Sequence, residues 1–207
     1  MSLASLTQAA HQNAERQEFA REMMSGSMSQ EKYKTYLYNM WLIYDILEDV
    51  ALSMGCFGPE NPQMPADDLP LDGLIQADDI WADYTELGGT EDNPPTVVPS
   101  TEAYRSHIVK NCQHDKDKLF AHVYVRHMGD LSGGQMIKDK VPGSGKMYQF
   151  ADMTHSVDEM KALIRKRTKD SMADEANKSF EFSTKIFEEL NALTYYCLLY
   201  TSPSPRD

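Results

Sequence analysis

The chain has 207 residues and carries 20 Lys and Arg against 32 Asp and Glu, a net charge of −12. This length suffices for one domain with a hydrophobic core, and the negative charge disfavours nucleic acid as a partner because it repels phosphate. No apolar run approaches the roughly 20 residues of a membrane-spanning helix, so we expect no membrane anchor, and the N-terminus lacks the pattern of a signal peptide.

The first part of the chain has helical periodicity. We expect one long helix from the N-terminus, capped by Ser5 or Thr7 and broken at 25–27 by Ser-Gly-Ser. Ser29 then caps a second helix. Its apolar residues, spread over 33–51, cover more than one face, so this helix should be central in the fold.

Two stretches rich in Gly, Pro and Asp predict loops, at residues 55–73 and 88–99. A short helix at 74–87 should separate them. Four further helices are expected, at residues 102–112, 116–141, 157–172 and 173–199. No segment alternates cleanly between apolar and polar residues, so the predicted class is all-α.

The domain is expected to span residues 1–194. The end of the chain contains Pro203 and Pro205 and lacks an apolar anchor, so residues 195–207 are expected to form a tail that is disordered or foreign to the natural protein.

The three cysteines, Cys56, Cys112 and Cys197, stand far apart in the sequence. None belongs to a Cys-x-x-Cys pair, which argues against a structural zinc site. An odd number without framework spacing indicates reduced thiols. We therefore expect a cytosol-like location, the cytoplasm or, in a eukaryote, the plastid stroma.

The segment 124–135 places three glycines in a predicted helix, where each costs about 1 kcal/mol relative to alanine. Gly129 and Gly133 are four residues apart and share one face, which would let a flat, bulky ligand approach the backbone. The same spacing also suits close packing of two helices, and the spacing alone leaves both interpretations open.

Asp130 lies beside this bare face in an apolar neighbourhood. Its carboxylate could pair with Arg126, four residues earlier, or hold a water molecule. An ordinary ion pair between these two residues on a solvated face is the alternative to a functional role.

His11 lies among small residues, with Glu15 four residues further on. A carboxylate that holds the Nδ1–H of a histidine is the usual partner of a metal-bound imidazole. An exposed histidine paired with a glutamate is the common alternative.

The remaining histidines show no metal-binding pattern. A helix end is expected between His107 and His114, and His122 and His127, five residues apart, should face different directions. No Glu-x-x-His occurs, which argues against a di-iron helical bundle. Serine-hydrolase, phosphate-loop and dinucleotide-binding glycine motifs are absent as well.

The segment 129–135, Gly-Asp-Leu-Ser-Gly-Gly-Gln, closely resembles the distal helix of the heme oxygenase family. Residues 11–19 resemble the proximal helix of that family. The similarity continues in the family's order through 41–44, 161–165 and 186–190. One departure is Ala4, which stands where the family usually has a basic residue.

The resemblance implies an all-α fold with heme b, both cofactor and substrate, between the proximal and distal helices. It implies that His11 is the axial iron ligand and that Glu15 orients its ring. The implied catalytic residues are Tyr44, Arg126, Gly129, Asp130 and Gly133. The implied heme-binding residues are His11, Glu15, Tyr124, Gly129, Ser132, Gly133, Lys161, Arg165 and Phe180, with Lys161 and Arg165 toward the propionates.

The implied reaction is oxidative ring opening of heme to biliverdin, with release of carbon monoxide and ferrous iron. It uses O2 and electrons from ferredoxin or a reductase, and the implied enzyme is a monomer. The only dense basic cluster that could meet an acidic donor is Lys161, Arg165, Lys166, Arg167 and Lys169. Two alternatives stay open: a heme-binding or storage protein, which would not need Asp130, and a helical protein without heme.

Overall fold

The structure, a computed structural model, describes residues 2–58 and 71–201, with side-chain surroundings up to residue 193. The described parts contain helices and no strand, which confirms the predicted all-α class. The elements are α1 (Leu3–Leu6), α2 (Gln8–Glu15), α3 (Glu18–Ser25), α4 (Gln30–Ser53), α5 (Ala77–Glu86), α6 (Pro99–His107), η1 (Ile108–Cys112), α7 (Lys116–Gly129), η2 (Asp130–Gly134), α8 (Gln135–Ile137), η3 (Lys146–Tyr148), α9 (Val157–Arg167), η4 (Asp170–Met172) and α10 (Ala173–Thr201).

The N-terminal segment forms three short helices where one long helix was predicted. Ser2 caps α1 by accepting a hydrogen bond from the Ser5 backbone N–H at 3.3 Å. The hydroxyl of Thr7 donates a hydrogen bond to the Leu3 carbonyl at 3.0 Å, which gives a partner to a carbonyl group of α1. The Thr7 side chain makes no capping hydrogen bond to the start of α2. The predicted break at 25–27 is confirmed, because Gly26 ends α3 with a left-handed φ of 73°.

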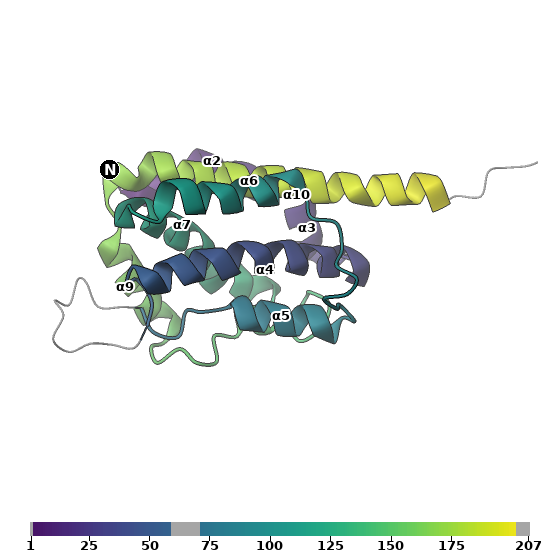
Figure 1. Ribbon diagram of the computed structural model, residues 1–207, viewed down its shortest axis with the longest axis horizontal. Helices are drawn as coiled ribbons and strands as arrows, with labels where there is room; N and C mark the ends of the chain where they lie inside the picture. Colours follow the sequence, from purple (N-terminus) through teal and green to yellow (C-terminus); the bar gives the residue numbers. More distant parts are fainter. Residues whose placement is uncertain (1, 59–70, 202–207) are drawn as a thin grey trace, which may run out of the picture.

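Helix α4 is central, as its apolar pattern predicted. The Ser29 side chain caps it by accepting from the Lys32 N–H at 3.3 Å. Helices α5, α6, α7 and α10 all pack on it, and Figure 1 shows α4 between α5 on one side and α6, α7 and α10 on the other. Its buried side chains include Leu37, Ile43 and Leu47, each 0% exposed.

Contacts between helices set the limits of α5. The buried carboxylate of Glu48, on α4, accepts the backbone N–H groups of Gln76 and Ala77, each at 2.9 Å. These are the unpaired donors at the start of α5, so the helix begins at Ala77 and not at Leu74.

Helix α6 begins at Pro99, three residues before the predicted start, because proline suits the first position of a helix. The expected helix at 116–141 contains α7, η2 and α8 and ends at Ile137, and the one at 157–172 is divided into α9 and η4. Two short π-helical stretches, η1 and η2, follow α6 and α7.

Helix α10 is the longest and reaches Thr201, so the expected tail of residues 195–207 begins within it. Residues 202–207 and most of the predicted 55–73 loop lie outside the described residues. In the part of the chain that the structure covers, no helix is long and apolar enough to cross a membrane.

Candidate functional site

A cavity of about 870 Å³ is lined by residues from α1, α2, α3, α4, α7, η2, α8, η3, α9 and α10. All twelve site residues proposed from the sequence line it. They are His11, Glu15, Tyr44, Tyr124, Arg126, Gly129, Asp130, Ser132, Gly133, Lys161, Arg165 and Phe180. Ala4 lines it as well, so the position where the family usually has a basic residue lies at this cavity.

The bare glycine face borders the cavity and does not serve helix packing. A Cβ atom added to Gly129 or Gly133 would meet no atom within 4 Å. Gly134 differs, because a Cβ there would lie 2.5 Å from Cδ1 of Tyr148. The helix-packing interpretation is therefore wrong for Gly129 and Gly133, whereas Gly134 is the glycine at which a neighbouring ring packs closely.

The carboxylate of Asp130 is bound by a tyrosine, and not by Arg126, which was one of the partners that the sequence left open. The hydroxyl of Tyr44, on α4, donates a hydrogen bond to Oδ2 of Asp130. Burial raises the pKa of Asp130 to about 6, although the bond from Tyr44 opposes the shift. Burial, together with the charge of Asp130, also raises the pKa of Tyr44 well above its ordinary value, so this hydroxyl keeps its proton.

Arg126 does not form the expected i, i+4 ion pair with Asp130. Its guanidinium lies over the ring of Tyr104, 5.0 Å from the ring centroid, and its Nη1 points to the sulfur of Met40 at 3.8 Å. Its Nε and Nη2 atoms are buried without a hydrogen-bond partner in the described structure. Buried donors of this kind require a partner, and Arg126 lines the cavity.

His11 and Glu15 form the expected contact through a different nitrogen. Glu15 Oε1 lies 3.2 Å from Nε2 of His11, not from Nδ1. The histidine side chain is 52% exposed, and no other described group holds the ring by a hydrogen bond, so the carboxylate pairs with the nitrogen it reaches. The ring of Phe180 lies 5.2 Å from the His11 ring, centroid to centroid, and tilted against it.

Two basic residues of α9, Lys161 and Arg165, lie at the cavity. Lys161 Nζ is 3.9 Å from Asp158, and the positive charge of Arg165 reaches Tyr124, where it opposes the rise of the tyrosine pKa caused by burial. Lys169 is different, because its ammonium binds both carboxylate oxygens of Asp117 at 2.7 and 2.8 Å. It is therefore not the unengaged docking cation that the basic cluster suggested.

Sequence reasoning missed two cavity tyrosines, Tyr36 and Tyr148. Tyr36 could have been found, because it is eight residues before Tyr44 and shares its helix face. Tyr148 lies in η3, after a turn with no periodicity, so its approach to Gly134 could not be predicted.

Comparison with known proteins agrees with this geometry. A sequence profile described as heme oxygenase matches residues 1–189. Heme oxygenase 2 of Macaca fascicularis is 28% identical over 203 residues, covering 89% of this chain and 63% of its own. Heme oxygenase 1 of Nostoc sp. is 26% identical, covering 89% of this chain and 82% of its own. The chain thus spans less than two thirds of the mammalian heme oxygenase 2 proteins it matches.

Solved structures share the fold. Heme oxygenase-1 of the cyanobacterium Synechocystis, crystallised with heme, superposes with a TM-score of 0.78 at 22% identity, covering 98% of this chain and 97% of that one. The heme oxygenase of Leptospira interrogans superposes with a TM-score of 0.73 at 24% identity, covering 91% of this chain and 100% of its own. With the profile match over residues 1–189, these likenesses show that the chain belongs to the heme oxygenase family.

Proposed function

We propose that the protein binds heme b in this cavity and opens its ring oxidatively to biliverdin, with release of carbon monoxide and ferrous iron. The observation that carries the proposal is the open space over Gly129 and Gly133, where a side-chain-free helix face borders a cavity of about 870 Å³. A flat macrocycle can lie against such a face. Family membership supports the assignment.

Iron binding falls to His11, the one histidine that lines the cavity. Rotation of its ring would bring Nδ1 to Glu15 and leave Nε2 for the iron, which is the arrangement of a histidine ligand held by a carboxylate. The exposure of the side chain leaves the ring room to turn. Phe180 would contact the heme beside the ligand.

Binding of the propionates falls to Lys161 and Arg165, which line the cavity. A guanidinium can pair with a carboxylate through two hydrogen bonds, so Arg165 is the stronger partner. Tyr124 and Ser132 complete the polar part of the lining and would contact the heme edge.

When bound, heme supplies the iron that reacts with O2 and the ring that is oxidised. The protein's part is to hold protons and water nearby. A carboxylate with a pKa of about 6 can accept a proton and return it close to neutral pH, and the tyrosine bond fixes its position. The unpartnered Nε–H and Nη2–H groups of Arg126 are donors that can anchor a water molecule beside Asp130.

The buried Asp130, held by Tyr44, favours an enzyme over a heme-storage protein. Storage would need the ligand His11 and the basic residues of α9 but no buried acid. Asp130 costs stability in its ionised form, because burial raises its pKa. This destabilising carboxylate lies at the border of the cavity, where the reaction needs a group that binds and releases a proton.

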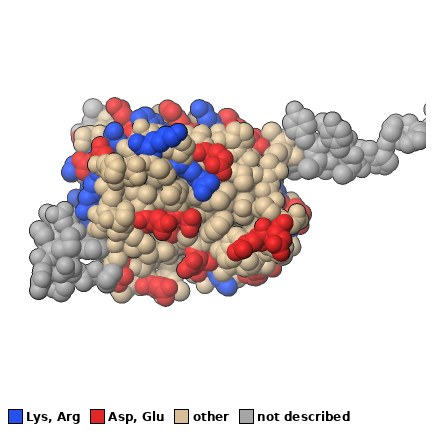
Figure 2. All heavy atoms as spheres, in the orientation of Figure 1, with Lys and Arg blue, Asp and Glu red and all other residues tan. Residues whose placement is uncertain are grey.

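The electron donor is proposed to be ferredoxin or a reductase. Charge is unevenly distributed on the face shown in Figure 2, where Asp and Glu gather in the lower half and Lys and Arg toward the upper left. An acidic donor would avoid the acidic region, so we propose the basic residues of α9, on the rim of the cavity, as its docking site. A monomeric state and a location in the cytoplasm or plastid stroma remain predictions.

Addition of hemin to the purified chain tests the proposal. A Soret band, followed after addition of a reductant in air by decay of the band and appearance of biliverdin on chromatography, is the expected result. A stable Soret band without biliverdin would indicate a heme-binding protein that does not react. Absence of the band would refute heme binding itself.

A further inference from the structure

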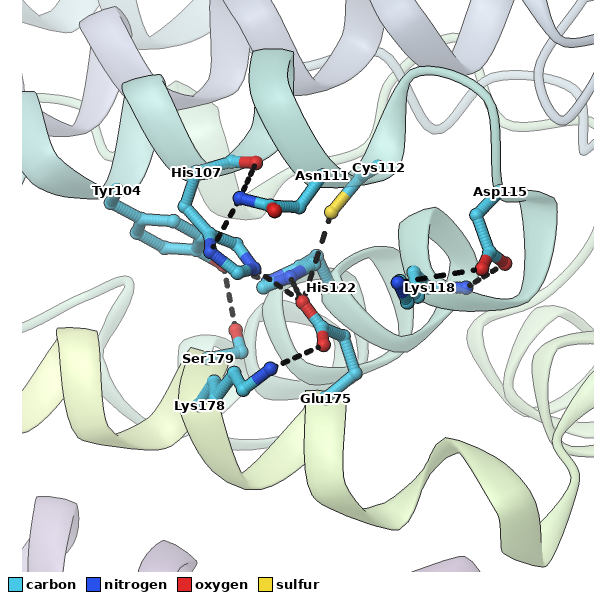
Figure 3. Close-up of polar contacts among 10 residues, drawn as sticks. All are labelled: Tyr104, His107, Asn111, Cys112, Asp115, Lys118, His122, Glu175, Lys178 and Ser179. Carbon is cyan, nitrogen blue, oxygen red and sulfur yellow. Dashed lines mark hydrogen bonds and ion pairs between the residues drawn. The ribbon is translucent and has the colours of Figure 1, made fainter.

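A second cluster of metal-ligating side chains lies outside the heme cavity. It consists of His107, Cys112, His122 and Glu175, whose ligand atoms all lie within 4.8 Å of one another. Figure 3 shows them converging from three parts of the chain: α6 with η1, α7 and α10. This cluster could not be recognised in the sequence, because its members are not adjacent and include no Cys-x-x-Cys pair.

One carboxylate oxygen lies at the centre of the cluster. Oε1 of Glu175 is hydrogen-bonded to Nε2 of His107 and lies 3.1 Å from Nε2 of His122 and 3.8 Å from Sγ of Cys112. The side chains of His122 and Cys112 are 0% exposed. Three potential ligands, two imidazoles and one thiol, thus share a single buried acceptor.

The backbone is distorted at this position. His107 and Cys112 are five residues apart, and a straight α-helix would direct them to different sides. The chain between them forms the π-helical stretch η1 (Ile108–Cys112). A π-helix has i→i+5 hydrogen bonds and a wider turn than an α-helix, so residues five apart lie closer to one side, and it mostly occurs as a single turn, frequently at a functional site. Its effect here is to bring the two side chains to the same point.

Three of the four ligands are also held by a partner on the side away from the cluster. The hydroxyl of Tyr104 lies 2.9 Å from Nδ1 of His122 and 2.6 Å from the hydroxyl of Ser179. Lys178 donates to Oε2 of Glu175 at 3.0 Å, which turns Oε1 toward the cluster. Partners of this kind on the far side of each ligand are characteristic of metal sites, because they fix the orientation of the ligand.

The second histidine has a similar partner. The side-chain amide of Asn111 lies 3.2 Å from Nδ1 of His107. Coordination through Nε2 places the imidazole proton on Nδ1, so Asn111 must then present its oxygen to the ring. Tyr104 needs no such turn, because a hydroxyl can accept from His122 and donate to Ser179.

We propose that these four residues bind a divalent transition metal ion, Zn²⁺ by preference, which ties α6, α7 and α10 together. Zinc ligands lie about 2.0–2.3 Å from the ion, so two ligands of one ion are at most about 4.6 Å apart. The ligand atoms of the four side chains, all within 4.8 Å of one another, are therefore already close to this limit. Thiolate and imidazole donors select Zn²⁺ over Mg²⁺ or Ca²⁺.

Charge also matches. Binding would release the thiol proton of Cys112, and the thiolate and the Glu175 carboxylate together balance the two positive charges of the ion. An ion whose charge is balanced by its ligands is much cheaper to bury than an isolated charge, and the ammonium of Lys178, which also pairs with Glu175, is half exposed to solvent. The competing interpretation is a hydrogen-bonded network that holds the three helices without a metal.

Titration with Co²⁺ distinguishes the metal site from the metal-free network. Co²⁺ replaces Zn²⁺ in such sites and shows an intense near-ultraviolet band when a thiolate coordinates it. The reduced, heme-free full chain is expected to bind one Co²⁺ with this band, and added Zn²⁺ should abolish the band. Absence of the thiolate band in the wild-type protein would overturn the proposal.

Variants locate the site. Cys112→Ser should lose the band, whereas Cys56→Ser, which alters another buried thiol, should retain it. Tyr104→Phe should weaken Co²⁺ binding by about 10–100-fold, the usual cost of losing a partner behind a ligand. A band that survives Cys112→Ser would refute the assignment.

A further variant covers the case in which Cys112→Ser does not fold. The double variant C56S/C197S leaves Cys112 as the only thiol of the chain and must keep the band. Its loss there would refute the site. Zn²⁺ should also raise the melting temperature of this variant, because a ligand that binds only the folded state stabilises that state.

Discussion

The hydroxyl of Tyr44, on α4, donates a hydrogen bond to Oδ2 of Asp130, on η2, and the two residues are 86 positions apart in the chain. This bond gives Asp130 a fixed position at the border of the cavity. It also replaces the local ion pair with Arg126 that the sequence suggested, and leaves two donor groups of that arginine without a partner.

Loss of the Asp130 carboxylate should stop the reaction without preventing heme binding. Asp130→Asn is expected to keep the Soret band and to lower the rate of biliverdin formation by about 100-fold or more, the usual effect of removing a proton-transfer group. Single-turnover absorption spectroscopy with reductant in air measures this rate. Asp139→Asn, which removes an exposed carboxylate nearby, is the matched control. Biliverdin formation at the wild-type rate in Asp130→Asn would exclude Asp130 from the mechanism.

The same carboxylate should leave a signature in the pH dependence of stability. Burial raises the pKa of Asp130 to about 6 from the ordinary aspartate value of 3.8, so the folded state binds the proton more tightly than the unfolded state. Its contribution to the free energy of unfolding should therefore decrease as pH rises from about 4 to 6, by about 3 kcal/mol. Urea titrations of the wild type and Asp130→Asn at several pH values test this. The difference between the two curves should show this trend, and parallel curves would contradict it.

The adjacent glycines Gly133 and Gly134 should respond differently to alanine. Gly133→Ala is expected to leave the fold intact, or to stabilise it by up to about 1 kcal/mol, because alanine favours helix and its Cβ meets nothing. It should nevertheless weaken heme binding by about 10-fold, because the methyl group intrudes on the heme face. Gly134→Ala should instead destabilise the protein by about 1–3 kcal/mol through its clash with Tyr148. Urea unfolding and hemin titration of both variants measure the contrast, and equal effects would refute the division.

Removal of the proposed axial ligand should be rescued by a small molecule. His11→Ala is expected to change the free energy of unfolding by less than about 0.5 kcal/mol, since the side chain is 52% exposed. The wild-type heme spectrum should disappear, and added imidazole should restore much of it. His155→Ala, which removes a histidine absent from the cavity lining, serves as the control. An unchanged heme spectrum in His11→Ala would assign the iron to another ligand.

Glu48 should be a major contributor to stability. Its buried carboxylate caps the start of α5 from the neighbouring helix α4, and it lies 3.4 Å from Nε2 of His127. Glu48→Ala leaves two buried N–H groups unpaired and is expected to cost about 2–4 kcal/mol of unfolding free energy. Asp49→Ala removes the adjacent, exposed carboxylate and should change it by less than about 0.5 kcal/mol. Chemical denaturation of the two variants compares them directly.

The sequence by itself determined the all-α class, the central position of α4 and the bare glycine face. These features depend on local periodicity. A helix repeats every 3.6 residues whatever surrounds it, so Gly129 and Gly133 must share a face, and the dense apolar pattern at 33–51 must be buried on several sides. The heme oxygenase motif could be recognised for the same reason, since its residues are consecutive.

Only the tertiary structure decided which neighbour each polar group has. Tyr44 meets Asp130, and Glu175 gathers His107 and His122, because separate helices pack against one another. A local pattern contains no information on such long-range pairs. Buried polar groups need hydrogen-bond partners, and this need selects the pairs. Asp130 is hydrogen-bonded to Tyr44 because that hydroxyl lies within reach in the folded core. Arg126, the local alternative, instead lies over the ring of Tyr104.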